Sequence, residues 1–230
     1  MKILSIIPAR GGSKGIPKKN IIDVNGKPLI AYTIEPAMEA LRNGAIDEVI
    51  VSTDSEEIAE VARSFGASVP FLRPENISGD KAKSIEFIQH ALDYFKKGGR
   101  HFDAILLLQP TSPLRTGSDI REAIELFKNS SNDSLISCFE EEYINDLVIY
   151  RLDADGKTSI PVSPLHNKGV RRQDHGSLYV RNGCIYITSV SLAEKGFVIG
   201  EQPLMYIMDK NRSVNVDTME DLELLRKMLQ

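Results

Sequence analysis

The sequence contains few cysteines: only Cys138 and Cys184 occur among its 230 residues. Both lie in apolar stretches, LISCF and NGCIYI, so we expect two buried, reduced thiols rather than a disulfide bond. A chain of this length can bury roughly 70–75% of the surface that its unfolded form exposes. It therefore needs neither a disulfide nor a structural metal to stabilise its core.

Long hydrophobic runs are also absent. The first residues, MKILSIIPAR, contain an apolar run that is too short for a signal peptide, and no stretch approaches the roughly 20 apolar residues of a membrane-spanning helix. The formal net charge is −4, so the molecule as a whole has no attraction for nucleic acid or for anionic membranes. We therefore expect a cytoplasmic protein with no nucleic-acid or membrane partner, in which a local basic cluster holds any anionic ligand.

Strand-like and helix-like patterns alternate along most of the chain. The expected strands are residues 3–8, 47–53, 67–72, 103–108 and 204–208, and the expected helices are residues 29–42, 55–66, 84–97, 117–129 and 218–229. Ser55 and Thr218 are the expected N-caps of two helices. This order predicts a doubly wound α/β fold with a mostly parallel, Rossmann-like sheet, whose ligand lies at the carboxyl ends of the strands.

The middle of the chain departs from this alternation. Between residues 134 and 186, the segments ISCFEE, LVIYRL and GCIYIT have the pattern of extended strands, and Asp155-Gly156 has that of a hairpin turn. We interpret residues 1–230 as a single domain. An antiparallel insertion at about 134–186 would either cover the ligand site or pair two subunits.

The loop at residues 9–20, ARGGSKGIPKKN, contains basic residues and no acidic one. Its basic residues are Arg10, Lys14, Lys18 and Lys19. Its glycines let the backbone turn tightly and bring N–H groups against a ligand, which suits a polyphosphate directly after the first strand. A solvated basic turn is the alternative. The loop matches neither the Walker A pattern nor GxGxxG.

Two other segments have polar residues in patterns that binding sites use. Residues 109–115 (QPTSPLR) directly follow a buried strand, and two prolines stiffen them, although a rigid link to a capped helix fits equally well. The adjacent Arg171 and Arg172 suit a carboxylate or phosphate through paired N–H donors. A surface cluster of ion pairs is the alternative for these arginines.

Residues 213–217 (SVNVD) are expected to form a strand that places Asn215 and Asp217 on one face. Mg²⁺ commonly binds one or two carboxylates together with substrate phosphates, so Asp217 is a candidate ligand. The alternative is that Asp217 helps to start the final helix.

In this order and spacing, the segments closely resemble the acylneuraminate cytidylyltransferases, also called CMP-sialic acid synthetases. The matching segments are residues 8–20, 52–54 (STD), 73–74 (RP) with Ser84, 109–117 (QPTSPLRTG), 182–186 (NGCIY) and 215–218 (NVDT). The resemblance spans essentially the whole chain. It implies a nucleotidyltransferase fold and transfer of CMP from CTP to the anomeric hydroxyl of an acidic nine-carbon keto-sugar, with release of pyrophosphate.

The resemblance also assigns roles to residues. Those implied to bind the nucleotide are Arg10, Gly11, Ser13, Lys14, Lys19, Asn20, Arg73 and Ser84. Those implied to bind the sugar are Gln109, Arg172, Asn182 and Tyr186. Arg10, Lys19 and Asp217 would be catalytic, and Asp217 with Asn215 would hold Mg²⁺. The family and the mid-chain insertion both suggest a homodimer.

The sequence departs from the family pattern in three places. The family usually has Asp-x-Asp where this chain has Asn215-Val216-Asp217, which leaves a second metal site open because a neutral amide adds no charge. An arginine expected at Val180 lies one place later, at Arg181, and would point to the opposite face of a strand. Residues 143–145 replace the usual His-Pro. The nucleotide half thus matches better than the sugar half, so the acceptor could be a relative of neuraminate such as legionaminate or pseudaminate.

Two other functions compete with this interpretation. One is a cytidylyltransferase for 3-deoxy-manno-octulosonate, although its first loop usually lacks the SKG and KN signatures found here. The other is a catalytically silent nucleotide-binding subunit, which Asn215 favours.

Overall fold

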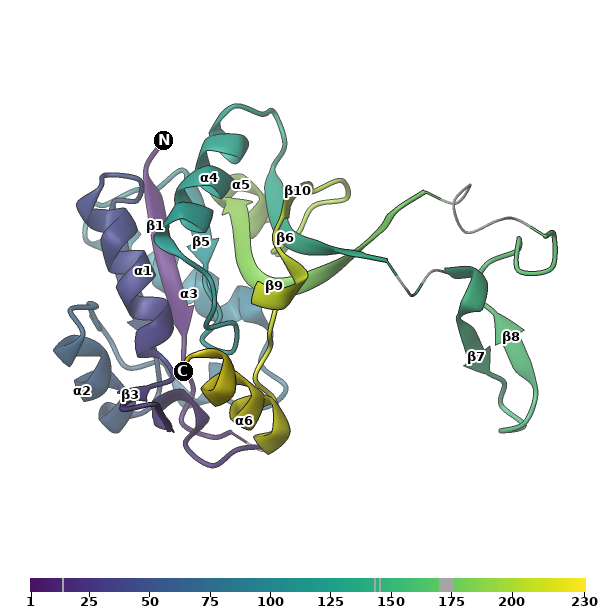
Figure 1. The fold of residues 1–230 in the computed structure, drawn as a ribbon. Helices are drawn as coiled ribbons and strands as arrows, with labels where there is room; N and C mark the ends of the chain where they lie inside the picture. Colours follow the sequence, from purple (N-terminus) through teal and green to yellow (C-terminus); the bar gives the residue numbers. More distant parts are fainter. Residues whose placement is uncertain (14, 143, 145, 170–175) are drawn as a thin grey trace.

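The computed structural model describes residues 1–13, 15–142, 144, 146–169 and 176–230. Within these ranges, a six-stranded sheet has the order β10-β6-β9-β5-β1-β4 (Figure 1). Its strands are β1 (Ile3–Pro8), β4 (Glu48–Ser52), β5 (Ala104–Leu107), β6 (Ser134–Glu141), β9 (Leu178–Ser189) and β10 (Leu204–Ile207). Strand β9 runs antiparallel to β5 and β6, whereas the other pairs are parallel. The expected mostly parallel α/β fold is confirmed.

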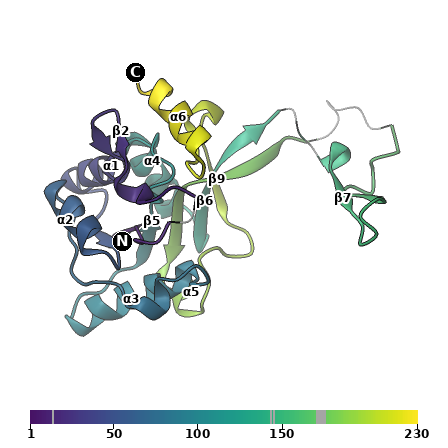
Figure 2. The same ribbon diagram turned by 90° about the horizontal axis from the view of Figure 1, so that it is seen from below.

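Helices cover both faces of this sheet, as Figure 2 shows for α1 and α4 on one side and α3 and α5 on the other. The helices are α1 (Ala31–Arg42), α2 (Glu56–Ser64), α3 (Ser84–Lys97), α4 (Gly117–Lys128), α5 (Val190–Glu194) and α6 (Met219–Met228). Ile3 and Ile7 of β1 pack in the core beside α1 and α4, while Leu4 and Ile6 pack in the core beside α3. Because both faces of β1 are buried, its sequence is a nearly continuous apolar run rather than an alternation of apolar and polar residues.

Side-chain caps determine where several helices begin. Ser55 Oγ accepts a hydrogen bond from Ile58 N at the start of α2, and Thr218 forms a capping box with Asp221 at the start of α6, so both expected caps are confirmed. Thr116 forms a third such cap, directly after the 109–115 loop. An N-cap of this kind stabilises its helix by about 1 kcal/mol.

The expected strand at residues 67–72 is wrong in part. It is reduced to two isolated bridges, which Ser68 and Leu72 form with the segment around β4. Pro70 lies between them and has no N–H to donate, so a continuous ladder cannot form there. Strand β4 is therefore the edge of the sheet.

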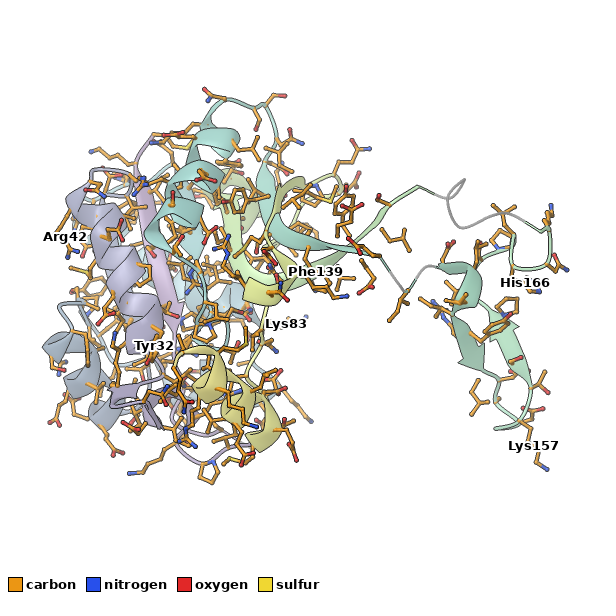
Figure 3. All side chains as sticks on the ribbon, in the orientation of Figure 1. Tyr32, Arg42, Lys83, Phe139, Lys157 and His166 are labelled. Carbon is orange, nitrogen blue, oxygen red and sulfur yellow. The ribbon has the colours of Figure 1, made fainter. Side chains whose placement is uncertain are left out.

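The middle of the chain forms the expected antiparallel structure. Strands β6 and β9 pair along their length, and β7 (Tyr150–Leu152) and β8 (Ser159–Pro161) form a hairpin that turns at Gly156, which has a φ of 69°. The hairpin and the described residues around it, 146–169, are called the arm below. In Figures 1 and 3 the arm, with Lys157 and His166, lies away from the sheet. Its role as a lid or a subunit contact stays a prediction.

Both cysteines are buried and unpaired, as expected, and burial raises the pKa of each thiol. No helix in the described parts of the chain has the length and apolar character needed to cross a membrane.

Candidate active site

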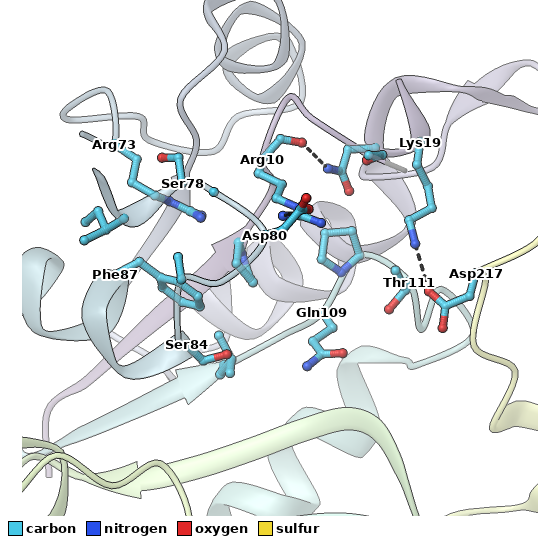
Figure 4. Close-up of a pocket in the computed structure, with 18 of the residues that line it drawn as sticks. Arg10, Lys19, Arg73, Ser78, Asp80, Ser84, Phe87, Gln109, Thr111 and Asp217 are labelled. Carbon is cyan, nitrogen blue, oxygen red and sulfur yellow. Dashed lines mark hydrogen bonds and ion pairs between the residues drawn. The ribbon is translucent and has the colours of Figure 1, made fainter. Parts of the chain in front are cut away.

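A cleft of about 430 Å³ opens at the carboxyl ends of β1 and β5 (Figure 4). The position agrees with the place where open α/β sheets bind ligands. Pro8 and Leu107, the last residues of the two strands, line it. Its other lining residues are Arg10, Ser13, Gly15, Lys19, Asn20, Arg73, Ile77, Ser78, Gly79, Asp80, Ala82, Ser84, Phe87, Gln109, Pro110, Thr111 and Asp217. Most residues that the sequence assigns to the nucleotide thus meet at one cleft.

The basic loop after β1 is held in shape by side chains on either side of it. Gly11 N–H donates to Asp54 Oδ1 at 2.8 Å, and Asn20 Nδ2 donates to the Arg10 carbonyl at 3.0 Å. The acidic residue of the STD segment therefore helps to organise the loop. Gly11 supports the loop without lining the cleft, and Lys14 lies outside the described residues.

Arg10 is paired with an acidic residue that the sequence analysis did not select. Arg10 Nη1 lies 2.7 Å from Asp80 Oδ1, and Asp80 comes from the segment that precedes α3 (Figure 4). Both side chains are partly exposed, so the ion pair is open to exchange with solvent or ligand. A carboxylate thus faces the guanidinium expected to bind phosphate.

Arg73 is a buried cation beside the cleft. Its Nε donates to Ser52 Oγ at 3.1 Å, its Nη2 donates to the Ser52 carbonyl, and its backbone N–H bonds to Thr53 O at 2.6 Å. Its guanidinium lies 4.6 Å from the centre of the Phe87 ring. Burial lowers the pKa of Arg73 to about 10, partly offset by Asp54, so the group stays charged at neutral pH. These contacts aim a fixed positive charge at the cleft.

Asp217 and Lys19 form an ion pair at the other end of the cleft. Lys19 Nζ donates to Asp217 Oδ1 at 2.9 Å and to the Val216 carbonyl at 3.0 Å, and Asn215 Nδ2 donates to Asp217 Oδ2. Asn215 is therefore beside the metal candidate but does not itself line the cleft. Among the described residues, no group of three or more His, Cys, Asp or Glu side chains could hold a metal.

The segment that carries Asp217 is placed by backbone contacts rather than by a sheet. The expected strand at 213–217 does not form; instead, Val216 N–H donates to Thr111 O at 2.7 Å. A Cβ on Gly15 would lie 2.6 Å from the Asp217 carbonyl oxygen, so only glycine allows this close approach. The first and last motifs of the sequence thus meet at the cleft.

The residues assigned to the sugar lie less close together. Gln109 lines the cleft, and Tyr186 is paired with the lining residue Leu107 across β9 and β5. Tyr186 is mostly buried, which raises its pKa. Asn182 is buried and does not line the cleft, while Arg172 lies outside the described residues.

The sequence also assigned no role to Arg115, the last residue of the QPTSPLR segment. Its side chain is enclosed: Nη1 donates to the Cys184 carbonyl at 2.5 Å and Nη2 donates to Thr33 Oγ1 at 2.8 Å. Burial lowers its pKa to about 10, with Cys184 and Asp119 acting in the opposite direction. Arg115 therefore ties the loop below the cleft to β9 and α1.

Comparisons with known proteins agree with these motifs. The family model described as cytidylyltransferase matches residues 4–230. A pseudaminic acid cytidylyltransferase of Campylobacter jejuni (strain 81-176) is 38% identical over 224 residues, covering 97% of this chain and 94% of the relative. A CMP-N,N'-diacetyllegionaminic acid synthase of Legionella pneumophila is 35% identical over 232 residues, covering 100% and 97%. An N-acylneuraminate cytidylyltransferase of Escherichia coli O18:K1:H7 is 37% identical, and the match covers 97% of this chain but 51% of the relative.

Solved structures share the fold at low identity. A CMP:2-keto-3-deoxy-manno-octonic acid synthetase complexed with CTP has a TM-score of 0.70 at 17% identity, covering 100% of this chain and 98% of the other. A 4-diphosphocytidyl-2C-methyl-D-erythritol synthase of Anaerococcus prevotii has a TM-score of 0.68 at 14% identity, with the same coverage. These similarities concern the fold alone.

Proposed function

The chain belongs to the cytidylyltransferase family, and from this premise we propose that it transfers CMP from CTP to the anomeric hydroxyl of a nine-carbon acidic keto-sugar and releases pyrophosphate. The observation that carries the proposal is the cleft at the strand ends, where Arg10, Lys19 and Arg73 gather in a net-acidic protein. Two relatives that match over nearly their whole length are named for acidic sugars of this class.

The nucleotide would lie across the carboxyl ends of β1 and β5. Arg10, Ser13 and Lys19 would hold the phosphates, with loop N–H groups and Asn20 nearby. Arg73 and Ser84 would hold the base and ribose, since both lie at the end of the cleft away from Asp217 (Figure 4). The sugar would lie beside Gln109 and Tyr186, with Arg172 as the candidate partner for its carboxylate.

The chemistry requires positioning and charge more than covalent participation. The anomeric oxygen attacks the α-phosphorus and forms a new P–O bond, the bond to the bridging oxygen breaks, and pyrophosphate leaves with the electron pair. The hydroxyl proton passes to solvent or to a nearby base. Fixed cations that face the phosphates stabilise the charge that develops in this step.

The donor set fits Mg²⁺ as the divalent metal. Asp217 is a single exposed carboxylate beside a phosphate-binding lysine, and Mg²⁺ is commonly held by one or two carboxylates plus substrate phosphates rather than by a protein cage. Asn215 could add a neutral oxygen if its amide turned. A bound Mg²⁺ would neutralise phosphate charge.

We propose pseudaminate or a close relative as the acceptor. The match to the pseudaminic acid enzyme covers nearly all of both chains, and the departures at Asn215 and Arg181 lie in the part of the sequence that resembles neuraminate enzymes less well. Because CTP is an intracellular nucleotide, the reaction also agrees with the cytoplasmic location expected from the sequence.

We further propose a homodimer that the arm helps to form. Several large apolar side chains of the arm lie in solvent: Val148, Tyr150, Leu152, Ile160, Val162 and Leu165 are each at least 38% exposed. An apolar surface exposed by so many side chains of one short segment is a candidate interaction site. A second copy of the chain would cover it with the same surface.

The test is pyrophosphate release from CTP and Mg²⁺ with pseudaminate, legionaminate, N-acetylneuraminate and 3-deoxy-manno-octulosonate offered in parallel. UTP, GTP and ATP serve as base controls. We expect release with CTP and a nine-carbon acid, with pseudaminate fastest. Release with the octulosonate alone would overturn the acceptor assignment. If CTP binds but no sugar reacts, the result supports the alternative hypothesis of a catalytically silent nucleotide-binding subunit. Asn215→Asp should then be tested for a gain of activity.

A further inference from the structure

Asn182 lies in an irregular part of β9. The pairing register of β6 and β9 shifts between Ile136 and Cys138, so that Asn182 falls in a bulge opposite Ser137. The next residue, Gly183, has a φ of 76°, a conformation that favours glycine. Bulges re-aim side chains, and they are frequent next to active sites. The bulge therefore turns the Asn182 side chain away from the regular ladder.

The side-chain amide of Asn182 is fully engaged. Its Oδ1 accepts from Ser137 Oγ at 2.6 Å and from Cys184 N at 3.1 Å, while its Nδ2 donates to Ser213 Oγ at 2.9 Å and to Met208 Sδ at 3.4 Å. The Cys184 N–H can only donate, so the oxygen of the amide must face it. With both lone pairs and both N–H groups used, the amide has no capacity left for a sugar hydroxyl.

Ser213, which accepts a hydrogen bond from Asn182, is the first residue of the segment that carries Asn215 and Asp217. Ser213 Oγ donates its only proton to the Asp209 carbonyl at 2.9 Å and accepts from Asn182 Nδ2. One side-chain bond therefore joins the bulge of β9 to the segment on which the metal candidate lies.

We propose that Asn182 is a positioning residue that acts through Ser213 to hold residues 213–217, and with them Asp217, in place at the cleft. This inference rests on the proposed function. Asn182 is only 6% exposed and does not line the cleft, and a sugar could reach its amide only by leaving buried partners unpaired. The NGCIY motif, which the sequence analysis assigned to the sugar, would instead position the Asp217 carboxylate.

The test changes each partner of the Asn182–Ser213 hydrogen bond separately. Ser213→Ala removes the hydroxyl without changing Asn182, and Ser213→Thr keeps it. The matched control is Ser64→Ala, at an exposed serine whose Oγ donates to Val61 O. We expect Ser213→Ala to lower kcat about 3- to 10-fold, as for one lost hydrogen bond, with the KM for the sugar within about twofold of wild type. Hydrogen exchange at the Val216 amide should rise in parallel, while Ser213→Thr and the control behave as wild type.

Asn182→Asp is the second test variant, because it keeps the oxygen acceptor and removes the N–H donor to Ser213. We expect the same pattern of change, and a double variant with Ser213→Ala no worse than the more severe single variant. A rise in the KM for the sugar with unchanged kcat and unchanged Val216 exchange would show direct contact with the sugar and overturn the proposal. So would a Ser213→Ala protein that matches wild type, or one whose exchange rises uniformly along the chain.

Failure of the proposed function has a different signature. In that case the wild-type protein would release no pyrophosphate, but the exchange rates of the wild type and its variants would still decide whether Asn182 holds the 213–217 segment.

Discussion

The cleft and the arm differ in whether their side chains find partners within the same chain. At the cleft, charged groups have partners in the same chain: Arg73, which is 6% exposed, is bonded to Ser52, and Arg10 is paired with Asp80. In the arm, apolar groups lie in solvent: Val148 is 60% exposed and Leu152 is 68% exposed. The cleft is thus organised by one chain, whereas the arm presents surface that only another surface can bury.

This difference separates two kinds of substitution. Changes at or beneath the cleft should alter stability or catalysis while leaving assembly intact. Changes in the arm should alter assembly first.

The largest effect is expected beneath the cleft, at Arg115. Arg115→Ala leaves the Cys184 carbonyl and Thr33 Oγ1 without their donor and opens a cavity, so we expect a loss of about 3–5 kcal/mol in the free energy of unfolding. Urea unfolding measures it. The control is Arg63→Ala, at an exposed arginine that pairs with Glu56, which should cost less than about 1 kcal/mol. Equal losses in the two variants would contradict a structural role for the buried arginine.

A smaller effect, on rate rather than on stability, is expected for Arg10. Arg10→Ala removes a cation expected to face the phosphates and should lower kcat/KM about 10²- to 10³-fold, which corresponds to about 2.7–4 kcal/mol of transition-state stabilisation. Steady-state pyrophosphate release measures it, with the unfolding midpoint and the sedimentation coefficient expected to match wild type. A variant with near-normal turnover would remove Arg10 from the mechanism.

The arm should respond in the opposite way. Leu152→Asp places a charge on its most exposed large apolar side chain and should weaken the proposed dimer by about 1–3 kcal/mol, with CTP affinity unchanged. Analytical ultracentrifugation over a concentration series measures it. Lys157→Asp, at the tip of the same hairpin, introduces the same charge as a control and should leave the dimer intact. If wild type is a monomer at all concentrations, the dimer proposal is wrong.

The parts that the sequence predicted well depend on local patterns. The alternation of strands and helices follows from short-range periodicity, and the caps at Ser55 and Thr218 need only neighbouring residues. Arg10, Lys19 and Gln109 were placed at the cleft because polar residues that follow parallel strands converge at one edge of the sheet. Local chemistry and topology together were sufficient for these.

The parts that it missed depend on contacts between distant segments. Nothing local marks Asp80 as the partner of Arg10, or Phe87 as the ring beneath Arg73. The pattern of residues 213–217 fits a strand, but the segment has no sheet edge to join and is held by Thr111 and Ser213 instead. The bonds of Asn182 to Ser137 and Ser213 were also not predicted, because a motif does not identify the atoms that a side chain contacts.

The smallest effect is expected at Asp80, which tests whether the cleft is organised for the free protein or for its ligand. The Asp80 carboxylate pairs with Arg10 at 2.7 Å, so CTP phosphates must compete with it. Asp80→Asn removes the charge at nearly constant size and should lower the KM for CTP about two- to fivefold, since a partly exposed ion pair contributes up to about 1 kcal/mol. Asp93→Asn, at an exposed carboxylate of α3 that does not line the cleft, is the control. A raised KM would instead mean that Asp80 holds Arg10 in its binding geometry, so that this ion pair preorganises the cleft for the nucleotide.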